Sequence, residues 1–241
     1  SSLRKRLDLR GEDLIAVATS TGELLEELSK VRGIVDHLGA YAGGRTDESS
    51  ATGEDIHHTM QRIQRLTLAV AADLGKRVRV ETSLTDMDTL PDAFRRLLKE
   101  GLPQLVRNAV AHGIESGNER LQAGKTAEGS VRIEVRRGET GVLELEVADD
   151  GRGIDAGELR RKLVDSGRYQ EHEVAAMTVR EVIATIFQPG MSTADDVNEH
   201  AGRGVGLDVL YSLVRETGAR IKLVSTPSSF TRFILQWSPA L

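Results

Sequence analysis

Two consecutive segments in the middle of the chain alternate between apolar and charged residues. The two sets are Val131, Ile133 and Val135 against Arg132, Glu134 and Arg136, then Leu143, Leu145 and Val147 against Glu144 and Glu146. Successive side chains of a strand point to opposite faces, so a sheet built from these strands has one face that needs cover and one that faces water. The chain therefore has to place its helices on one side of a sheet.

The rest of the chain after residue 76 supplies further strands and the helices. Alternation predicts strands at residues 78–82, 220–225 and 231–237, and three- and four-residue spacing predicts helices at residues 91–112, 158–165, 179–187 and 205–217. These elements indicate an α+β fold, within the broad α/β class, whose sheet is antiparallel or mixed.

The first third of the chain has a different pattern. Apolar residues spaced alternately by three and four predict a long helix over residues 14–38, and a second helix over residues 56–74 ends at Gly75. One interpretation is an intramolecular helical hairpin and the other is a dimer bundle. We favour the homodimer, because two helices alone have few surfaces on which to bury such a seam.

Composition excludes several classes of function. The net charge is −5 and aromatic residues make up 3% of the chain, which argues against nucleic acid as a partner, since phosphate binding needs a basic face and base stacking needs aromatic rings. The absence of cysteine excludes disulfides and thiolate metal sites. No apolar run approaches the ~18 residues of a membrane span, so we expect no membrane span and a cytoplasmic protein.

One helix carries a row of polar side chains beside its apolar face. Gln104, Asn108 and His112 are spaced by four residues and project from one face of a regular helix. The carbonyl oxygen of Asn108 is a ligand that Mg²⁺ accepts, and Arg107 or His112 can contact phosphate. Taken alone, this row is more simply interpreted as the solvent-facing side of an amphipathic helix.

Two glycine-containing segments follow. Residues 149–154 come at the end of a strand, where the carboxylate of Asp149 can accept a hydrogen bond from an adenine amino group, although a plain turn is the common alternative. Residues 202–206 run directly into a helix, where backbone N–H groups suit phosphate. This second segment does not follow a strand, which argues against a dinucleotide-binding site of the Rossmann type.

In this order the three segments resemble the N, G1 and G2 boxes of the ATP-binding fold shared by gyrase, Hsp90, histidine kinases and MutL. Residues 105–115, 149–155 and 192–209 are specifically similar to the chemotaxis kinase family of the CheA type. The resemblance covers roughly residues 56–237. It implies the Bergerat ATP-binding fold, a two-layer sandwich of a mixed sheet and helices, preceded by an N-terminal α-helical dimerisation segment. The expected domains are residues 1–55 for the dimerisation-like segment and residues 56–241 for the catalytic domain.

The resemblance also assigns site residues. It implies that Asn108 holds Mg²⁺, that Asp149 binds adenine, and that ATP is the nucleotide. The positions near the reacting phosphates are Gln104, Arg107 and His112. The remaining nucleotide-binding positions are Gly151, Gly153, Ser192, Thr193, Gly202, Arg203, Gly204, Gly206 and Thr231.

Three positions depart from the family pattern. Gln104 stands where the family typically has a histidine, Ala194 where a lysine is common, and Phe230 where a glycine precedes the threonine. The first two changes remove a potential acid–base group and a cation, so they affect phosphoryl transfer more than nucleotide binding.

The resemblance predicts an ATP-dependent protein-histidine kinase. It would transfer the γ-phosphoryl group to a histidine on a separate phosphotransfer domain, from which a response regulator would take it. The alternative is a degenerate nucleotide-binding dimeric regulatory module without efficient turnover. A topoisomerase, chaperone or repair ATPase is a third hypothesis, which would require a further domain that supplies a lysine. His57 and His58 lack the Glu or Asp and the Pro that follow an acceptor histidine in sensor kinases, so we expect a solvated pair.

Overall fold

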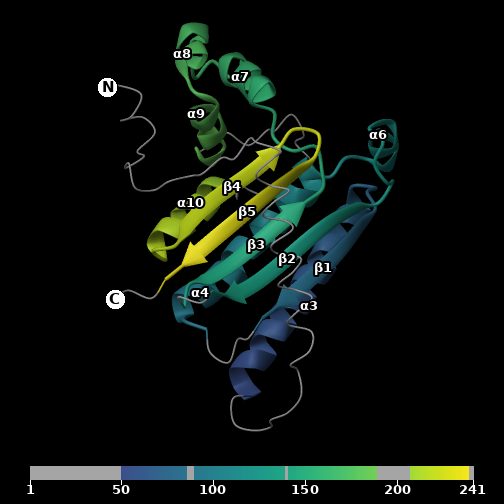
Figure 1. Cartoon of the computed structure of the whole chain (residues 1–241), viewed down its shortest axis with the longest axis vertical. Coiled ribbons are helices and arrows are strands. Elements are labelled where there is room, and N and C mark those ends of the chain that lie inside the picture. Colours follow the sequence, from purple (N-terminus) through teal and green to yellow (C-terminus); the bar gives the residue numbers. More distant parts are fainter. Residues whose placement is uncertain (1–49, 86–89, 139–140, 189–206, 239–241) are drawn as a thin grey trace.

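The computed structural model describes residues 50–85, 90–138, 141–188 and 207–238. Five strands form one sheet in the order β1-β2-β3-β5-β4 (Figure 1). Their bounds are β1 Val78–Leu84, β2 Gly129–Arg137, β3 Leu143–Asp149, β4 Arg220–Thr226 and β5 Phe230–Trp237. β1 pairs parallel with β2 and the other pairs are antiparallel, so the sheet is mixed, as expected.

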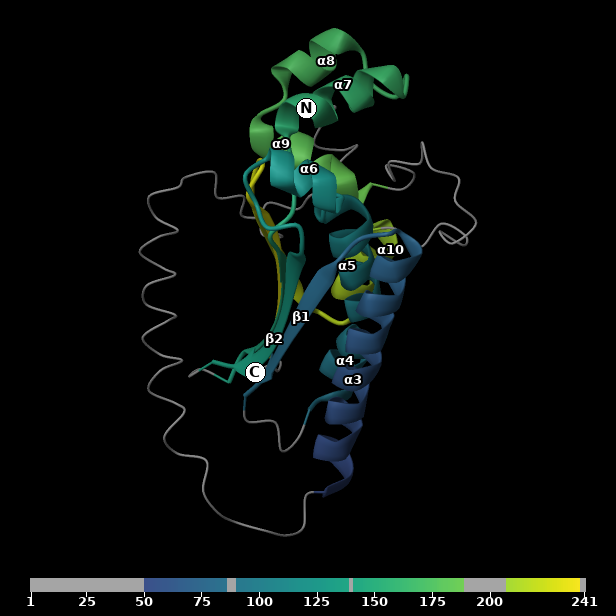
Figure 2. The ribbon, with the colours of Figure 1, turned by 90° about the vertical axis from the view of Figure 1, so that its right-hand side faces the viewer.

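Helices cover one face of this sheet. Figure 2 shows the sheet nearly edge-on with α3, α4, α5 and α10 on the same side. The bounds are α3 Ser50–Asp73, α4 Asp92–Arg96, α5 Leu102–Asn108 and α10 Leu207–Glu216, with the π-helical turns η1 Leu97–Gly101 and η2 Ala109–Gly113. The run from α4 to η2 is the helix predicted over residues 91–112. The two-layer sandwich is therefore confirmed.

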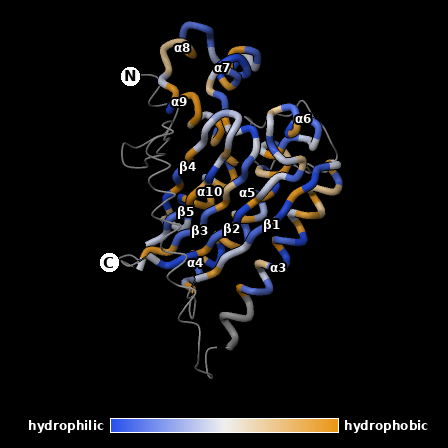
Figure 3. The backbone as a smooth tube through the Cα atoms, turned by 45° about the vertical axis from the view of Figure 1, so that its right-hand side comes forward, coloured by the Kyte–Doolittle hydropathy of each residue, from blue (hydrophilic) through white to orange (hydrophobic). Residues whose placement is uncertain are grey.

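The core lies between the two layers. The apolar residues of β2 and β3 that alternation assigned to the covered face are all buried, and they pack with Phe94, Leu98 and Leu105 of the helical layer. The opposite face carries ion pairs such as Arg232 with Glu146. Figure 3 shows the alternation of hydrophobic and hydrophilic residues along the strands. Burial of the apolar set explains why this chain forms a two-layer structure.

Smaller helices gather at the end of the sheet where β3 stops (Figure 1). They are α6 Gly117–Gln122, α7 Ala156–Asp165, α8 Glu171–Ala176, α9 Val179–Ala184 and the 3-10 turn η3 Thr185–Phe187. Helices α7 to α9 form a second core around Leu163, Tyr169 and Val182. The sequence analysis did not predict α6 and α8, because six residues are too few to show a helical period.

The described part of α3 ends as the sequence predicts. Gly75 takes a positive φ of 63°, and its N–H donates to the carbonyl of Ala72, which closes the helix in the way that glycine favours. The helix predicted over residues 14–38 lies outside the described residues. No helix in the described ranges combines the length and apolar character that a membrane span requires.

Candidate functional site

The candidate site is built around Asp149, the last residue of β3. Leu143, Leu145 and Val147 point into the core, and strand alternation places Asp149 on the same face, toward the helical layer. The residue is 6% exposed. Its Oδ1 accepts the N–H of Gly151 at 3.0 Å. A carboxylate is thus held inside the molecule where a strand ends.

This environment raises the pKa of Asp149 to about 7. Burial is the main cause, the charges of Asp150 and Glu115 act in the same direction, and the Gly151 N–H and Lys125 oppose them. Among the described residues, no hydrogen bond reaches the second oxygen, Oδ2. A buried carboxylate with an unused acceptor suits a ligand that brings its own N–H donor, such as the adenine amino group.

Gly151 lets the loop after β3 approach the end of the covering helix closely. A Cβ on Gly151 would stand 2.1 Å from the carbonyl oxygen of Gly113, and that same oxygen accepts the N–H of Arg152 at 2.9 Å. Any side chain at Gly151 would therefore push the loop after β3 away from the end of the covering helix. The close approach seen here is between two backbone segments of this chain, and the assignment of Gly151 to the adenine pocket stays a prediction.

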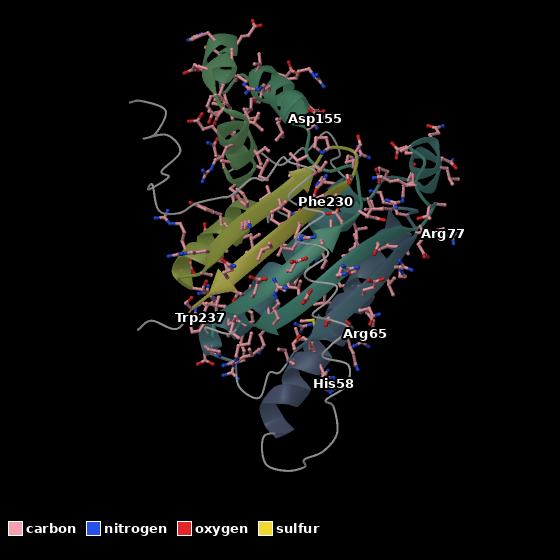
Figure 4. The ribbon with its side chains drawn as sticks, viewed as in Figure 1. His58, Arg65, Arg77, Asp155, Phe230 and Trp237 are labelled. Carbon is pink, nitrogen blue, oxygen red and sulfur yellow. The ribbon has the colours of Figure 1, made fainter. Side chains whose placement is uncertain are left out.

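The loop also packs against the turn between β4 and β5. Gly153 has a φ of 66°, and a Cβ there would stand 2.1 Å from the carbonyl oxygen of Thr226. Thr231 is paired with Asp149 across β3 and β5, and its Oγ1 lies 3.3 Å from the hydroxyl of Ser225. Thr231 is thus buried beside Asp149. In Figure 4, Phe230 labels the end of β5 that lies next to Thr231, and Trp237 labels the opposite end of the strand.

The covering helix supplies the amide side chains. Gln104 and Asn108 both lie in α5, one turn apart, and are partly buried. The Nδ2 of Asn108 is buried and has no hydrogen-bond partner among the described residues. A half-turn of the amide exchanges Nδ2 for Oδ1, so this position can present the oxygen that Mg²⁺ prefers. The residue present therefore fits the predicted metal.

The other two polar positions of this helix are exposed. Arg107 lies at the end of α5, and His112 lies in the π-helical turn η2, where the number of residues per turn is larger than in an α-helix. The hydrogen bond from Ile114 N–H to the Ala109 carbonyl shows the five-residue spacing. The assignment of both residues to the phosphates stays a prediction.

Lys76 fixes the end of the same helix. Its Nζ donates to the carbonyls of Val110 and Ala111, both at 2.8 Å. Burial, and then the charge of Arg152, lowers the pKa of Lys76. The residue follows the Gly75 turn directly, next to Arg77, which Figure 4 labels beside the start of β1. The sequence analysis gave Lys76 and Gly113 no role, because a lysine after a helix and a glycine at a helix end are common features.

The predicted phosphate-binding residues after η3 lie outside the described residues. They are Ser192, Thr193, Gly202, Arg203, Gly204 and Gly206, with Ala194 among the departures from the family pattern. His57 and His58 are exposed on α3, and Figure 4 places His58 toward the end of the molecule away from Asp155.

The fold and the site define a class of ATPase domain. Residues 96–240 match the family described as histidine kinase-, DNA gyrase B-, and HSP90-like ATPase, and the chain belongs to this family. Within the family, the chain carries a CheA-like histidine kinase ATPase domain. The resemblance inferred from the three sequence segments is confirmed.

Several relatives share this part of the chain. The chemotaxis protein CheA of Rhizobium meliloti strain 1021 is 35% identical over 182 residues, or 76% of this chain and 24% of the relative. The gliding motility regulatory protein of Myxococcus xanthus is 42% identical over 128 residues, or 53% and 16%. The chemotaxis protein CheA of Treponema pallidum is 31% identical over 216 residues, or 88% and 26%. The chain thus spans about a quarter or less of the length of these curated relatives.

Proposed function

We propose that this chain is the ATP-binding kinase core of a two-component signalling system of the chemotaxis type. It binds ATP with Mg²⁺ and transfers the γ-phosphoryl group to a histidine on a separate phosphotransfer domain, and a response regulator then takes the group. The observation that carries the proposal is the buried carboxylate of Asp149, whose Oδ2 receives no hydrogen bond from the described residues. The unpartnered buried amide nitrogen of Asn108 on the covering helix adds to it.

The proposal assigns the described site residues to three parts of the bound nucleotide: the base, the metal and the reacting phosphates. Asp149 accepts a hydrogen bond from the adenine amino group, and Gly151 and Gly153 keep the loop close to the base. Asn108 would hold Mg²⁺, which neutralises charge on the phosphates when bound. Gln104, Arg107 and His112 would lie toward the reacting phosphates, where positioning and charge stabilisation supply most of the catalysis.

In the transfer step, one phosphoryl group moves from ATP to the acceptor histidine. A neutral imidazole nitrogen of the acceptor histidine bonds to the γ-phosphorus, the bond to the β–γ bridging oxygen breaks, and ADP leaves with that oxygen. The N–H proton of the acceptor ring can pass to water. The residues of this chain hold the nucleotide in line for that attack.

The relatives support the signalling context. Their names assign them to chemotaxis and to regulation of gliding motility. From the sequence pattern, we propose that residues 1–55 form a helical dimerisation segment, that residues 56–241 form the catalytic domain, and that the N-terminal helices form a homodimer.

A degenerate regulatory module is the second candidate. Gln104 favours it, because an amide one turn before Asn108 can donate and accept hydrogen bonds but cannot exchange a proton near neutral pH. Such a module would bind ATP, dimerise and transmit a conformational signal without efficient phosphoryl transfer.

Incubation with radiolabelled ATP separates these candidates. The chain is mixed with a histidine phosphotransfer domain from a CheA protein, and the label on that domain is measured over time. Labelling of the domain supports the kinase. Tight ATP binding without labelling supports the degenerate module, and absence of ATP binding overturns both.

A further inference from the structure

Four charged residues form a cluster beside the candidate site, which we call the α6 charge cluster. Its members are Glu115, Arg120, Lys125 and Asp150. Arg120 lies 3.1 Å from Glu115 and 2.8 Å from Asp150, and the Nζ of Lys125 lies 2.8 Å from Glu115. Burial acts to raise the pKa of Glu115, but the hydrogen bonds from Lys125, from a backbone N–H and from Arg120, together with the charge of Lys125, hold this pKa below its usual value.

Arg120 is 1% exposed, which is unusual for a residue that carries a permanent charge. A buried guanidinium is stable only when its donors are satisfied. Besides the two carboxylates, it donates to the backbone carbonyls of Thr126, Glu128 and Asp150. The cluster therefore ties the segment that contains α6 to the end of β3.

The contacts with the end of β3 fall on the two residues that follow Asp149. Arg120 and Lys125 both donate to the carbonyl of Asp150, and Lys125 also donates to the carbonyl of Gly151 at 2.6 Å. The side chain of Asp150 accepts the N–H of Ser130 at the start of β2. Arg120 of α6, Lys125 of the loop after α6 and Ser130 of β2 thus together hold the dipeptide Asp150-Gly151 in place.

We propose that Arg120 and Lys125 are positioning residues for the Asp149 carboxylate. By holding the carbonyls of Asp150 and Gly151, they orient the Gly151 N–H that donates to Asp149 Oδ1, which leaves Oδ2 directed at the base. The inference rests on the proposed function, because it takes adenine as the group that Asp149 binds. The residues themselves do not touch the nucleotide.

A purely structural role makes a different prediction. If the cluster only stabilised the fold, its loss would lower the melting temperature and leave the properties of Asp149 unchanged in the folded protein. A positioning role also changes base selectivity and the pH at which affinity is half-maximal. The charged groups that face Asp149 are Asp150, Glu115 and Lys125, and among them Lys125 favours the ionised carboxylate.

The experiment compares Lys125→Met with Lys125→Arg, Arg120→Met and the control Lys162→Met, which removes a surface ion pair with Glu158. Calorimetric titrations of the full chain with ATP and with GTP, each with Mg²⁺, are run across the pH range in which Asp149 titrates. Lys125→Met should lose about tenfold in ATP affinity, the effect of one hydrogen bond from a charged donor. It should also lose selectivity for ATP over GTP and show a pH midpoint above that of the wild type.

The outcomes distinguish this inference from the proposed function. Recovery of selectivity and midpoint in Lys125→Arg, with wild-type behaviour in Lys162→Met, supports the inference. If the wild type binds ATP and folded Lys125→Met keeps its affinity, selectivity and midpoint, the inference is wrong and the proposed function stands. If the wild type does not bind ATP, both are wrong. Should Arg120→Met fail to fold, the partly exposed Lys125 still decides the question.

Discussion

Gly113 lies against the carboxylate of Asp149, so closely that a Cβ at this position would stand 2.6 Å from Oδ1 and 2.9 Å from Oδ2. The two residues come from different layers. Gly113 ends the helical run that carries Asn108, whereas Asp149 is the last residue of β3. The contact therefore brings the end of the helical run that carries Asn108 against the carboxylate at the end of β3. A hydrogen atom on the Cα is the largest substituent that this contact allows.

Gly113→Ala should therefore weaken ATP binding by about tenfold or more, since the added methyl group displaces the Asp149 hydrogen bond. The melting temperature should fall by only a few degrees, about the effect of 1 kcal/mol or less, because the atoms that the methyl group displaces belong to a side chain and not to the backbone. Calorimetric titration and thermal unfolding measure the two effects. Gly138→Ala is the matched control, since its Cβ would meet the Val142 carbonyl at an ordinary 3.6 Å. Unchanged affinity in Gly113→Ala would show that the contact does not matter for the nucleotide.

ATP affinity should rise with pH through about 7, where Asp149 titrates. In the proposed binding mode the adenine amino group donates to the ionised carboxylate, so below this pH Asp149 must lose a proton before ATP binds. The ATP affinity should then fall by up to about tenfold for each pH unit below the pKa. The phosphates of ATP titrate near pH ~6 as well, so the wild-type profile is compared with that of Asp149→Asn. The variant should bind about 1.5–3 kcal/mol more weakly and lose the component near pH 7. If ATP affinity depends on pH in the same way in the wild type and in Asp149→Asn, Asp149 does not bind adenine.

The same pKa has a consequence for stability. The folded pKa of Asp149 lies above the value of 3.8 expected for an exposed aspartate, so the folded state binds more protons between these two values. The contribution of Asp149 to the free energy of unfolding should therefore decrease as pH rises from about 4 to about 7. Urea unfolding without nucleotide measures this effect. Between pH ~4 and ~7 the free energy of unfolding should decrease less with rising pH in Asp149→Asn than in the wild type.

Asn108→Ala should remove the enhancement of nucleotide binding by Mg²⁺. The side chain has an unpartnered buried amide, and alanine offers no oxygen in its place. The measurement is ATP affinity with Mg²⁺ and with EDTA. Asn118→Ala, an exposed asparagine of α6, serves as the control. If Asn108→Ala keeps the full enhancement, the metal is held elsewhere.

Gln104→His should raise the rate of phosphoryl transfer to a separate histidine domain. An imidazole one turn before Asn108 can exchange a proton near neutral pH, and positioned acid–base groups contribute roughly 10²–10⁴-fold. We expect a gain at the low end, because a neutral acceptor imidazole is already a good nucleophile. Initial rates with labelled ATP measure it, with Gln61→His on the exposed face of α3 as the control. An unchanged rate with intact ATP binding would remove the main argument for a degenerate module.

The longer strands and helices could be predicted because burial of one face gives them a regular pattern of apolar residues. The one-sided alternation of β2 and β3 predicted both the strands and the layer of helices, and Gly75 predicted the end of α3. The π-helical turns could not be predicted, because they interrupt the period on which the prediction of residues 91–112 depends.

The sequence could predict that the residues at the end of β3 and in the loop after it lie close together, because they are neighbours in the chain, while their roles toward a nucleotide stay predictions. These residues are Asp149, Gly151 and Gly153, and the structure places them together. The place of Arg120 could not be predicted, because an arginine in a short polar segment is normally exposed, and its burial depends on partners up to 30 residues away. The capping box of Ser116 and Glu119 was the one local signal for α6.

The two hydrogen bonds of Lys76 tie the turn after α3 to the end of the helical run that carries Asn108. The ammonium group sits one residue beyond the Gly75 turn and is bonded to the carbonyls of Val110 and Ala111. A rotation or axial shift of α3 therefore either carries the end of the Asn108 helix with it or breaks these two hydrogen bonds of a partly buried ammonium group. A movement of α3 would therefore be felt at Asn108 through Lys76 as well as through the core that the two helices share.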